Sequence, residues 1–581
     1  MADQATSAGP SIAESMDAAI ASFFASHNPV TYLLLAIITI ILVYPLFTSS
    51  DPDIHPFLLA RQSSAAPIRN PGESSVYRAL DVPHGYPLKA SLGVKDPGAP
   101  KWTSGRQGDL RDVLARAVRG PPAQDGSGYD ATKVGKVFTL LGKDKSTPTE
   151  MAEVMRIVNA IGGFTKGKVS GDGKVAVCLS NSLELLAAIF AAAFYDFSVT
   201  LIPSGLPQEL VDHLLTQIDV HVLVAEAGAL DLDTALPNCK SLKQVILLAK
   251  PDNKHMAWDE TPMPSGVEVA TWHDILDQSS ATNEVPTIEK DAAKPKPLGT
   301  FFMNSAGELE LSELSSENLV SGTAGLLSTL PRTGPLSPTD TLLPTTHLSQ
   351  PYTLCWALAA LYSNASLALT SVSGPRVDLF AALASFKPTI LVTAPGTLNK
   401  YLHNWTHTGL GPGRISRFWQ RRSLRAGIMP KRKPVPDLNA QEVVFLIVDL
   451  QSLAQVRAVF VGQEVEGPVG SAAPEDRLSS KAADELRVDL GLRISTALVD
   501  GRVAGAVAQS NLLDYRAKNA GEVCVGPPVG SVEVWVKGEE EAMGGPTPAG
   551  KIMVKGPAVV AGTVELGARA RVDTDHTLVL Q

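Results

Sequence analysis

The stretch "NSAGELELSELSSENL", Asn304–Leu319, decides how this chain is interpreted. It follows an apolar pair, Phe301-Phe302, and precedes residues with helical character. A loop between a strand and a helix is a place where backbone N–H groups cradle phosphates, and glycines let the phosphates approach. This stretch contains one glycine and four glutamates. Its position predicts a nucleotide loop, whereas its composition opposes one.

Short apolar runs alternate with helical patterns on both sides of this stretch. Runs typical of strands are Gly173–Ser180, Ser198–Pro203, Val220–Ala227, Leu242–Ala249 and Val456–Glu464, and helical patterns cover Asn181–Phe197, with Asn181 as N-cap, and Leu206–Asp219. This alternation predicts parallel sheets covered by helices on both faces. Short strands and turns from Gly521 to Gln581 predict a mostly antiparallel region. The predicted fold class is α/β, with one large domain over residues 136–581.

Composition narrows the class of protein. The chain has 581 residues, of which 44% are hydrophobic and 19% charged, so a folded body with a core is expected rather than a disordered chain. A net charge of −9 argues against a nucleic-acid partner. The cysteines lie far apart in the sequence, without metal-ligand spacing, so no metal site is predicted; they are Cys178, Cys239, Cys355 and Cys524.

The N-terminal region contains an uncharged segment, Pro29–Phe47, after a short lead over 1–28. As a helix the segment would span roughly 27 Å, close to the thickness of a bilayer, so we expect a transmembrane anchor. A signal peptide is disfavoured because no basic residue precedes the segment, and a buried core helix is the remaining alternative. Arg61 and Arg69 follow it, which predicts a single-pass protein with a cytosolic body. The sequence does not name the organelle; the endoplasmic reticulum is a working assumption. Residues 48–135, rich in Pro, Gly and Ser, are predicted to be a linker.

The order of these segments resembles the adenylate-forming (AMP-binding) superfamily, above all long-chain acyl-CoA synthetases. Similar stretches are Leu342–Leu369, Phe386–Leu402, Val456–Glu464 and Gly550–Gly562, and the anchor with its linker is similar to fungal membrane-anchored members. The resemblance implies a large domain that uses ATP and Mg²⁺ to form an acyl-adenylate and then passes the acyl group to CoA. It also implies a hinge and a small C-terminal domain with a catalytic lysine, which residues 136–581 do not include.

The chemical motifs of that family are degenerate here. The family's phosphate loop, T-S-G-T-T-G-x-P-K-G, aligns so that Asn304 replaces a glycine, Ser305 falls on a threonine, Gly307 on the last glycine before the proline, and Glu310 on the lysine. A glutamate at the lysine position repels a nucleotide. One like-charge contact at ~4 Å costs roughly 4 kcal/mol at an effective dielectric of ~20.

Two further motifs also depart from the family pattern. The family's Y-G-x-T-E begins at Leu498 and passes through Gly501, so its magnesium-binding glutamate becomes Arg502. The aspartate that would hold the ATP ribose falls on Ala568. His347 takes the position of a family histidine near the substrate, and a satisfied structural histidine is the alternative.

Charged clusters have two interpretations each. Glu308, Glu310, Glu313 and Glu317 are interpreted as a solvated helix start, with a docking surface as the alternative. The segment 414–433 contains no acid, and its membrane-surface candidates are Arg414, Arg417, Arg421, Arg422 and Arg425. Pairing with the protein's own acids is the alternative. The expected partners are therefore membrane lipid and a fatty acyl chain, and no protein partner is indicated.

Two functions follow from the sequence. The first is a pseudoenzyme, a membrane-tethered scaffold or acyl-binding regulator that forms no adenylates and needs no cofactor. The second is an active long-chain fatty acid–CoA ligase that uses ATP, Mg²⁺ and CoA. The exchanged motif residues favour the first and the framework favours the second. The sequence leaves open whether it is part of a longer enzyme.

Overall fold

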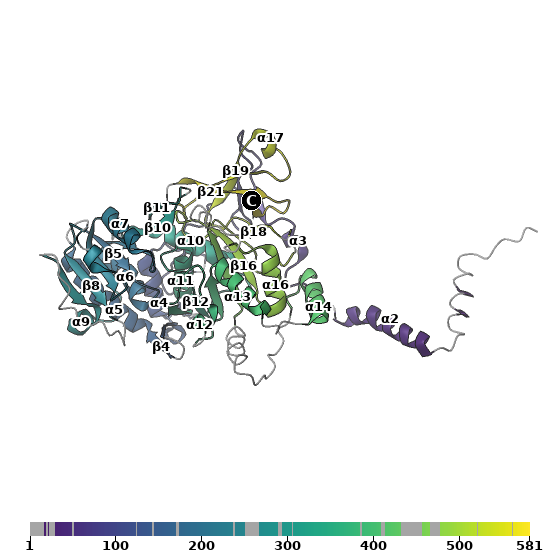
Figure 1. Cartoon of the computed structure of the whole chain (residues 1–581), viewed down its shortest axis with the longest axis horizontal. Helices are drawn as coiled ribbons and strands as arrows, with labels where there is room; N and C mark the ends of the chain where they lie inside the picture. Colours follow the sequence, from purple (N-terminus) through teal and green to yellow (C-terminus); the bar gives the residue numbers. More distant parts are fainter. Residues whose placement is uncertain are drawn as a thin grey trace, which may run out of the picture. The chain divides into compact units, whose positions relative to one another are not determined.

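The structure is a computed structural model that divides into two compact units, Met1–Asp53 and Ile54–Gln581. It describes residues 17–18, 21–22, 29–48 and 51–581, apart from residues 101, 124, 142–144, 170–172, 236, 238, 250–265, 289–292, 305, 384–385, 408–412, 431–455, 465–476, 517, 520 and 561. Figure 1 labels the helices and strands that these residues form.

The first unit contains helix α2, Pro29–Thr48. The predicted apolar helix therefore forms, and its side chains are largely exposed, with Leu33 at 62% and Leu42 at 67%. Within the described residues, however, no helix has both the length and the apolar character that a membrane crossing requires. The transmembrane anchor predicted for residues 29–47 is thus not confirmed.

The second unit contains two mainly parallel sheets. The first has the strand order β11-β10-β6-β5-β7-β8-β9. Its strands are β5 (Lys174–Cys178), β6 (Ser198–Leu201), β7 (Val220–Glu226), β8 (Gln244–Leu248), β9 (Glu268–Thr271), β10 (Leu298–Met303) and β11 (Leu309–Leu314). Only β11 runs antiparallel to its neighbour, β10. The strands predicted at residues 173–180, 198–203, 220–227 and 242–249 are confirmed.

The second sheet has the order β17-β16-β15-β14-β12-β13-β3-β4. Its strands are β3 (Lys136–Leu141), β4 (Lys145–Glu150), β12 (Thr341–Pro344), β13 (Ser366–Thr370), β14 (Ile390–Thr393), β15 (Ala458–Glu464), β16 (Ile494–Val499) and β17 (Ala508–Gln509). The strands β3, β13, β12, β14, β15 and β16 are parallel, while β4 and β17 close the two edges antiparallel.

A layer of helices lies between the two parallel sheets. In β5, Val175 and Val177 pack into the central core, whereas Ala176 and Cys178 face the opposite side, as the alternation of a strand requires. The central core contains side chains from both sheets and from α4 (Leu110–Arg119), α5 (Met151–Lys168), α6 (Leu183–Tyr195), α9 (Trp272–Gln278), α10 (Ser316–Thr329) and α11 (Pro351–Tyr362).

Shorter sets of helices cover the outer faces. On the first sheet these are α7 (Gln208–Ile218) and α8 (Leu232–Ala235), and on the second α12 (Leu379–Leu383), α13 (Pro395–His407) and α16 (Ser480–Leu490). Helix α14 (Arg414–Arg425) packs on α16. The order of layers is helix, sheet, helix, sheet, helix, which confirms the predicted α/β class.

The third sheet is antiparallel, with the order β1-β2-β19-β20-β21-β22-β18. Its strands are β1 (Ser63–Ala65), β2 (Tyr77–Ala79), β18 (Val523–Gly526), β19 (Glu533–Lys537), β20 (Ala549–Lys555), β21 (Thr563–Val572) and β22 (Leu578–Leu580), with helix α17 (Glu540–Met543) after β19. The antiparallel C-terminal region is confirmed, and two of its seven strands come from the N-terminal side of the chain.

The segment predicted as a linker, 48–135, is built into the body. Its strands β1 and β2 extend the third sheet, and helix α3 (Pro56–Leu59) precedes them. Val113 and Leu114 of α4 are fully buried in the central core. The abundance of Pro, Gly and Ser is typical of a linker, so the sequence did not show that this segment is part of the body. A few buried residues on one amphipathic helix are enough to attach such a loop-rich segment to a core.

Candidate functional site

Most of the residues predicted to form the nucleotide site lie at or beside the carboxyl ends of the parallel strands, where open α/β sheets bind ligands. Ala568 and the arginines of 414–425 lie elsewhere. β10 ends at Met303 and β12 leads into Thr345–His347. On the same second sheet as β12, β15 ends at Glu464 and β16 leads into Asp500. The loops after these strands decide what the site can hold.

The stretch 304–319 forms a hairpin before it reaches the helix. β10 turns directly into β11, with Phe302 opposite Glu310 and Met303 opposite Leu309. The interpretation of the glutamates as a helix start is therefore wrong for Glu308, Glu310 and Glu313, which lie on the turn and β11; they are followed by α10, whose first turn holds only Glu317. α10 is instead capped by Ser315 and Asn318, which bond each other's backbone.

Asn304 satisfies the backbone of the hairpin turn. Its Oδ1 accepts from the N–H of Ala306 and the N–H of Glu308, both at 2.9 Å. Its carbonyl oxygen accepts from the N–H of Gly307 at 3.0 Å, and its own N–H donates to the carbonyl of Glu308 at 2.8 Å. Gly307 has a φ of 83°, the left-handed conformation that closes the turn. The predicted loop residue Ser305 lies outside the described residues.

This turn does not fit a nucleotide phosphate. The N–H groups of residues 306–308, which a phosphate would need, are bonded within the turn. Glu310 lies where the resemblance places a lysine, and its Oε1 accepts from Asn304 Nδ2 at 2.6 Å. The side chains of the turn thus add negative charge and no cation. Nor do the described residues contain a group of three or more His, Cys, Asp or Glu side chains arranged to hold a metal ion.

Two of the degenerate motifs are in contact. A Cβ placed on Gly501 would lie 2.2 Å from the Cβ of Phe302, so the turn after β16 packs directly on the end of β10. Arg502 lies above the Phe302 ring, with its Cζ 4.9 Å from the ring centre. The two motifs therefore lie against each other, and the ring of Phe302 fills the space between them. Leu498, the first residue of the second motif, is buried within β16.

Arg502 is held by a bidentate ion pair. Its Nε and Nη2 donate to the two carboxylate oxygens of Asp500 at 2.9 and 2.8 Å, and its backbone N–H donates to the same carboxylate at 2.9 Å. The Asp500 side chain is 3% exposed. An acid at this position could ligate a cation, but here its oxygens are used by a guanidinium, so the pair is closed.

His347 is a buried polar bridge between the two parallel sheets. Its Nε2 lies 2.9 Å from the carbonyl oxygen of Leu179, which follows β5, and its Nδ1 lies 2.8 Å from the hydroxyl of Ser349. Burial lowers the pKa of His347 to about 4, and the hydrogen bond to Leu179 offsets a part of that shift. The imidazole is therefore neutral near pH 7, and both of its nitrogens are occupied.

Asn181 forms the second half of this bridge. Its Nδ2 donates to the carbonyl of Thr346 and its Oδ1 accepts from the N–H of Leu348, both at 2.8 Å. The prediction of Asn181 as N-cap of α6 is wrong: Ser182 caps the helix, with its hydroxyl accepting from the N–H of Leu185. Asn181 and His347 together are named the junction below.

Ala568 lies on β21, close to an irregularity in the pairing with β20 between Lys551 and Met553. It is half-buried against the core. The acids that follow are engaged elsewhere: Lys518 Nζ lies 2.9 Å from Asp573 and 3.0 Å from Asp575. The position that the resemblance assigns to ribose binding thus offers a methyl group.

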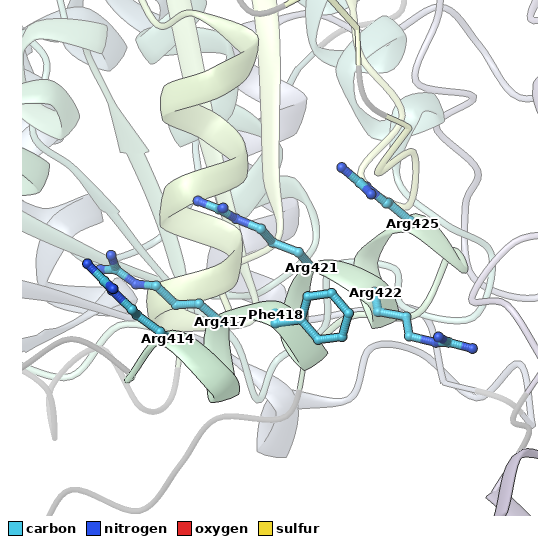
Figure 2. A pocket seen from close by; sticks show the side chains of 6 residues that line it. All are labelled: Arg414, Arg417, Phe418, Arg421, Arg422 and Arg425. Atoms are coloured by element: carbon cyan, nitrogen blue, oxygen red, sulfur yellow. The ribbon is translucent and has the colours of Figure 1, made fainter. Parts of the chain in front are cut away.

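The basic residues of 414–425 lie on α14, as Figure 2 shows. Arg417 pairs with Asp489 of α16 at 2.6 Å. The alternative in which these arginines meet the protein's own acids is therefore confirmed for Arg417. Arg414, Arg421, Arg422 and Arg425 are exposed.

The contacts that three residues make in this arrangement were not predicted from the sequence. Phe302 contacts Gly501 and Arg502, about 200 residues later in the chain, and no local pattern marks such a contact. Asp500 pairs with Arg502 only two residues away, but neither the sequence nor the resemblance indicated that pair. Asn304 carried a usable signal. An asparagine followed three residues later by a glycine is typical of a side chain that bonds its own turn, and it predicts a closed turn rather than an open cradle.

Comparison with solved structures identifies the fold. The chain is similar to the anthranilate CoA ligase AuaEII in complex with anthranoyl-AMP (14% identity, TM-score 0.56, 81% of this chain and 77% of that one). It is also similar to a long-chain-fatty-acid-CoA ligase from Archaeoglobus fulgidus (14%, 0.54, 85% and 86%) and a benzoate CoA ligase from Burkholderia xenovorans LB400 (13%, 0.53, 81% and 79%). No family model and no curated protein matches the sequence. The chain has the fold of the adenylate-forming CoA ligases.

Proposed function

We propose that this protein is a pseudoenzyme with the CoA-ligase fold, acting at a membrane as a scaffold or acyl-binding regulator and forming no acyl-adenylate. The observation that carries the proposal is the hairpin turn. Asn304 takes up the N–H groups of the turn, and Glu310 contributes a negative charge in place of a cation. A phosphate would have to break these hydrogen bonds and approach an acid.

The second motif supports the same function. The Asp500–Arg502 pair and the ring of Phe302 fill the space between the two motif loops. Removing one group that stabilises transition-state charge typically costs ~10²–10³ in rate. Several losses in one site need not multiply, because groups that act as a unit are non-additive. The expected adenylation rate is nevertheless close to background.

The alternative is an active long-chain fatty acid–CoA ligase that requires ATP, Mg²⁺ and CoA. The observation that favours it is the framework, which matches a structure named as a long-chain-fatty-acid-CoA ligase over 85% of this chain. In that case a rearrangement of the hairpin turn would have to release the N–H groups of Ala306 and Glu308 from Asn304.

Pyrophosphate release separates the two functions. Purified full-length protein is assayed with ATP, Mg²⁺ and palmitate or oleate beside a known synthetase, and ATP binding is measured by calorimetry. We expect neither binding nor release. Turnover that disappears in a Gly307→Trp variant would establish the ligase, because Gly307 has a positive φ and lies in the turn that would hold the phosphates.

Membrane attachment is the second part of the proposal. It is supported by the uncharged sequence of residues 29–47 and by the exposed apolar side chains of α2. We expect the full-length chain to stay with membranes during an alkaline carbonate wash, and a variant that lacks residues 29–47 to be released by it. Release of the full-length chain by the wash would contradict attachment through this segment.

A further inference from the structure

Helix α14 has one face turned to the body. Leu424 is buried in a small cluster with Val488 of α16 and with Tyr515. Arg417 lies on the same side and makes two hydrogen bonds to Asp489, at 3.1 and 2.6 Å. Residues three or seven apart share a face of a helix, so this side of α14 is occupied by packing and an ion pair.

The opposite face of α14 is apolar and exposed. Ile415, Phe418 and Trp419 are 78%, 62% and 53% exposed. The rings of Phe418 and Trp419 meet edge to face with 5.7 Å between their centres, and Arg422 Cζ lies 5.8 Å from the centre of the Trp419 ring. Three large hydrophobic side chains side by side on one short helix are unusual at a surface facing water.

Arginines flank this apolar face. Figure 2 shows Arg414 and Arg425 toward the two ends of α14, with Phe418 and Arg422 between them. Residues 414–425 contain no acidic side chain, so no charge on the helix itself offsets the arginines. Arg421 and Arg425 also act on Asp484 of α16: burial raises the pKa of that carboxyl, and Arg487, followed by Arg421 and Arg425, offsets a part of the shift. Arg414 and Arg422 are therefore the arginines of α14 that interact least with acids of the body.

Helix α3 carries a second exposed apolar pair. Phe57 and Leu58 of α3 are 82% and 59% exposed. Shortly after α3, Gln62 donates to Asp514 at 2.9 Å, and the next residue, Tyr515, packs against Leu424 of α14. The segment 62–65 and α14 are thus linked through Asp514 and Tyr515. The chain that follows α3 therefore contacts the segment on which α14 packs.

We propose that the outward face of α14 docks on a bilayer surface that carries anionic phospholipid. Aromatic rings insert at the level of the headgroups, and arginines pair with lipid phosphates and with the negative surface potential. An acidic protein or a nucleic acid would need the cations but would leave the three adjacent apolar side chains in water. The proposal deepens the membrane attachment proposed above, but it uses α14 and is independent of α2.

Vesicle binding of the full-length chain tests the charges. Binding to phosphatidylcholine vesicles is compared with binding to vesicles that also contain phosphatidylserine. Each basic residue near such a surface contributes about fivefold, so Arg414→Gln with Arg422→Gln is expected to lower the phosphatidylserine-dependent binding about 30-fold. The matched control is Lys166→Gln with Arg332→Gln, which removes two exposed cations on other parts of the unit. This control should change the phosphatidylserine-dependent binding less than about twofold.

Hydrogen exchange of the full-length chain locates the contact, even if α2 also attaches the chain to the vesicle. We expect peptides from 414–425 to exchange several-fold more slowly with phosphatidylserine vesicles than with phosphatidylcholine vesicles. The difference should vanish at about 1 M salt, where the Debye length is about 3 Å. Phe418→Ala with Trp419→Ala should remove this protection, and Trp102→Ala, at a ring that is 87% exposed elsewhere, should not.

Two results would overturn the proposal. One is equal exchange of 414–425 with both kinds of vesicle, which would leave attachment through residues 29–47 untouched. The other concerns the case in which the glutamine variant loses binding and also has a lowered melting temperature. If the conservative pair Arg414→Lys and Arg422→Lys then restored the melting temperature but not the binding, the positive charges would not be what holds the protein to the vesicle. Protection of α14 by an acidic protein or by RNA, with none by phosphatidylserine, would likewise assign the surface to a different partner.

Discussion

The junction and the hairpin turn lie after parallel strands of the same body, and each is organised around an asparagine. In the junction, Asn181 and His347 are 2% and 7% exposed and bridge the two sheets. In the turn, Asn304 bonds residues two to six positions away, and Ala306, Gly307 and Glu308 are exposed to water. A buried polar group that loses its partner cannot turn to water, whereas an exposed one can. The junction should therefore determine stability, and the turn should determine what the site accepts.

Asn181→Leu should have the largest effect. The carbonyl of Thr346 and the N–H of Leu348 would both remain buried without partners, at a cost of about 4 kcal/mol. Urea unfolding measures the loss. Asn519→Leu is the control, since Asn519 makes an exposed hydrogen bond to Glu522, and its effect should stay below about 1 kcal/mol. An Asn181 variant as stable as the control would show that the junction does not hold the sheets together.

His347 should make stability depend on pH. Its pKa is about 4 in the folded protein and near 6.5 when unfolded, so the unfolded chain takes up the proton first. This contribution is complete above pH 6.5 and is lost as the pH falls toward 4, by roughly 3 kcal/mol in total. Unfolding measured from pH 7 to 4 should show the slope, and His347→Gln should reduce it. An unchanged slope in the variant would assign the pH dependence to other groups.

Asn304→Ala should cost about 1 kcal/mol or less, because water can replace the amide at the exposed turn. Thermal unfolding measures this change. Calorimetry of the same variant should still show no ATP binding, since Glu310 remains. A loss as large as that of Asn181→Leu would remove the distinction between the junction and the turn.

Glu310→Lys should have the smallest effect on stability, within about 0.5 kcal/mol, since the side chain is exposed. Alone it should not produce ATP binding, because Asn304 still takes up the N–H groups of the turn. Combined with Asn304→Gly it should produce measurable binding by calorimetry. If Glu310→Lys alone bound ATP, the charge and not the closed turn would be what excludes nucleotide.

Much of the fold followed from local patterns. The sequence predicted the type and position of six elements: β5, α6, β6, α7, β7 and β8. Strands buried on both faces are continuous apolar runs, and apolar residues in helices recur every 3.6 residues, so both patterns are visible locally. The segment 48–135 was not readable in this way. Its strands β1 and β2 pair with each other and then with β19, more than 450 residues later, and no property of residues 63–79 encodes that partner.

The candidate site divides in the same way. By itself the sequence determined that Glu310 stands in an acidic turn, that Arg502 replaces an acid, and that α14 is basic and aromatic, because residue identity and helical spacing are local properties. Only the tertiary structure decided that Phe302 packs on Gly501 and lies beneath Arg502, and that Arg417 is taken by Asp489 while Phe418 and Trp419 stay exposed. Whether a charge is free or paired depends on which distant segment folding brings within hydrogen-bonding distance, and that is a property of the packed chain.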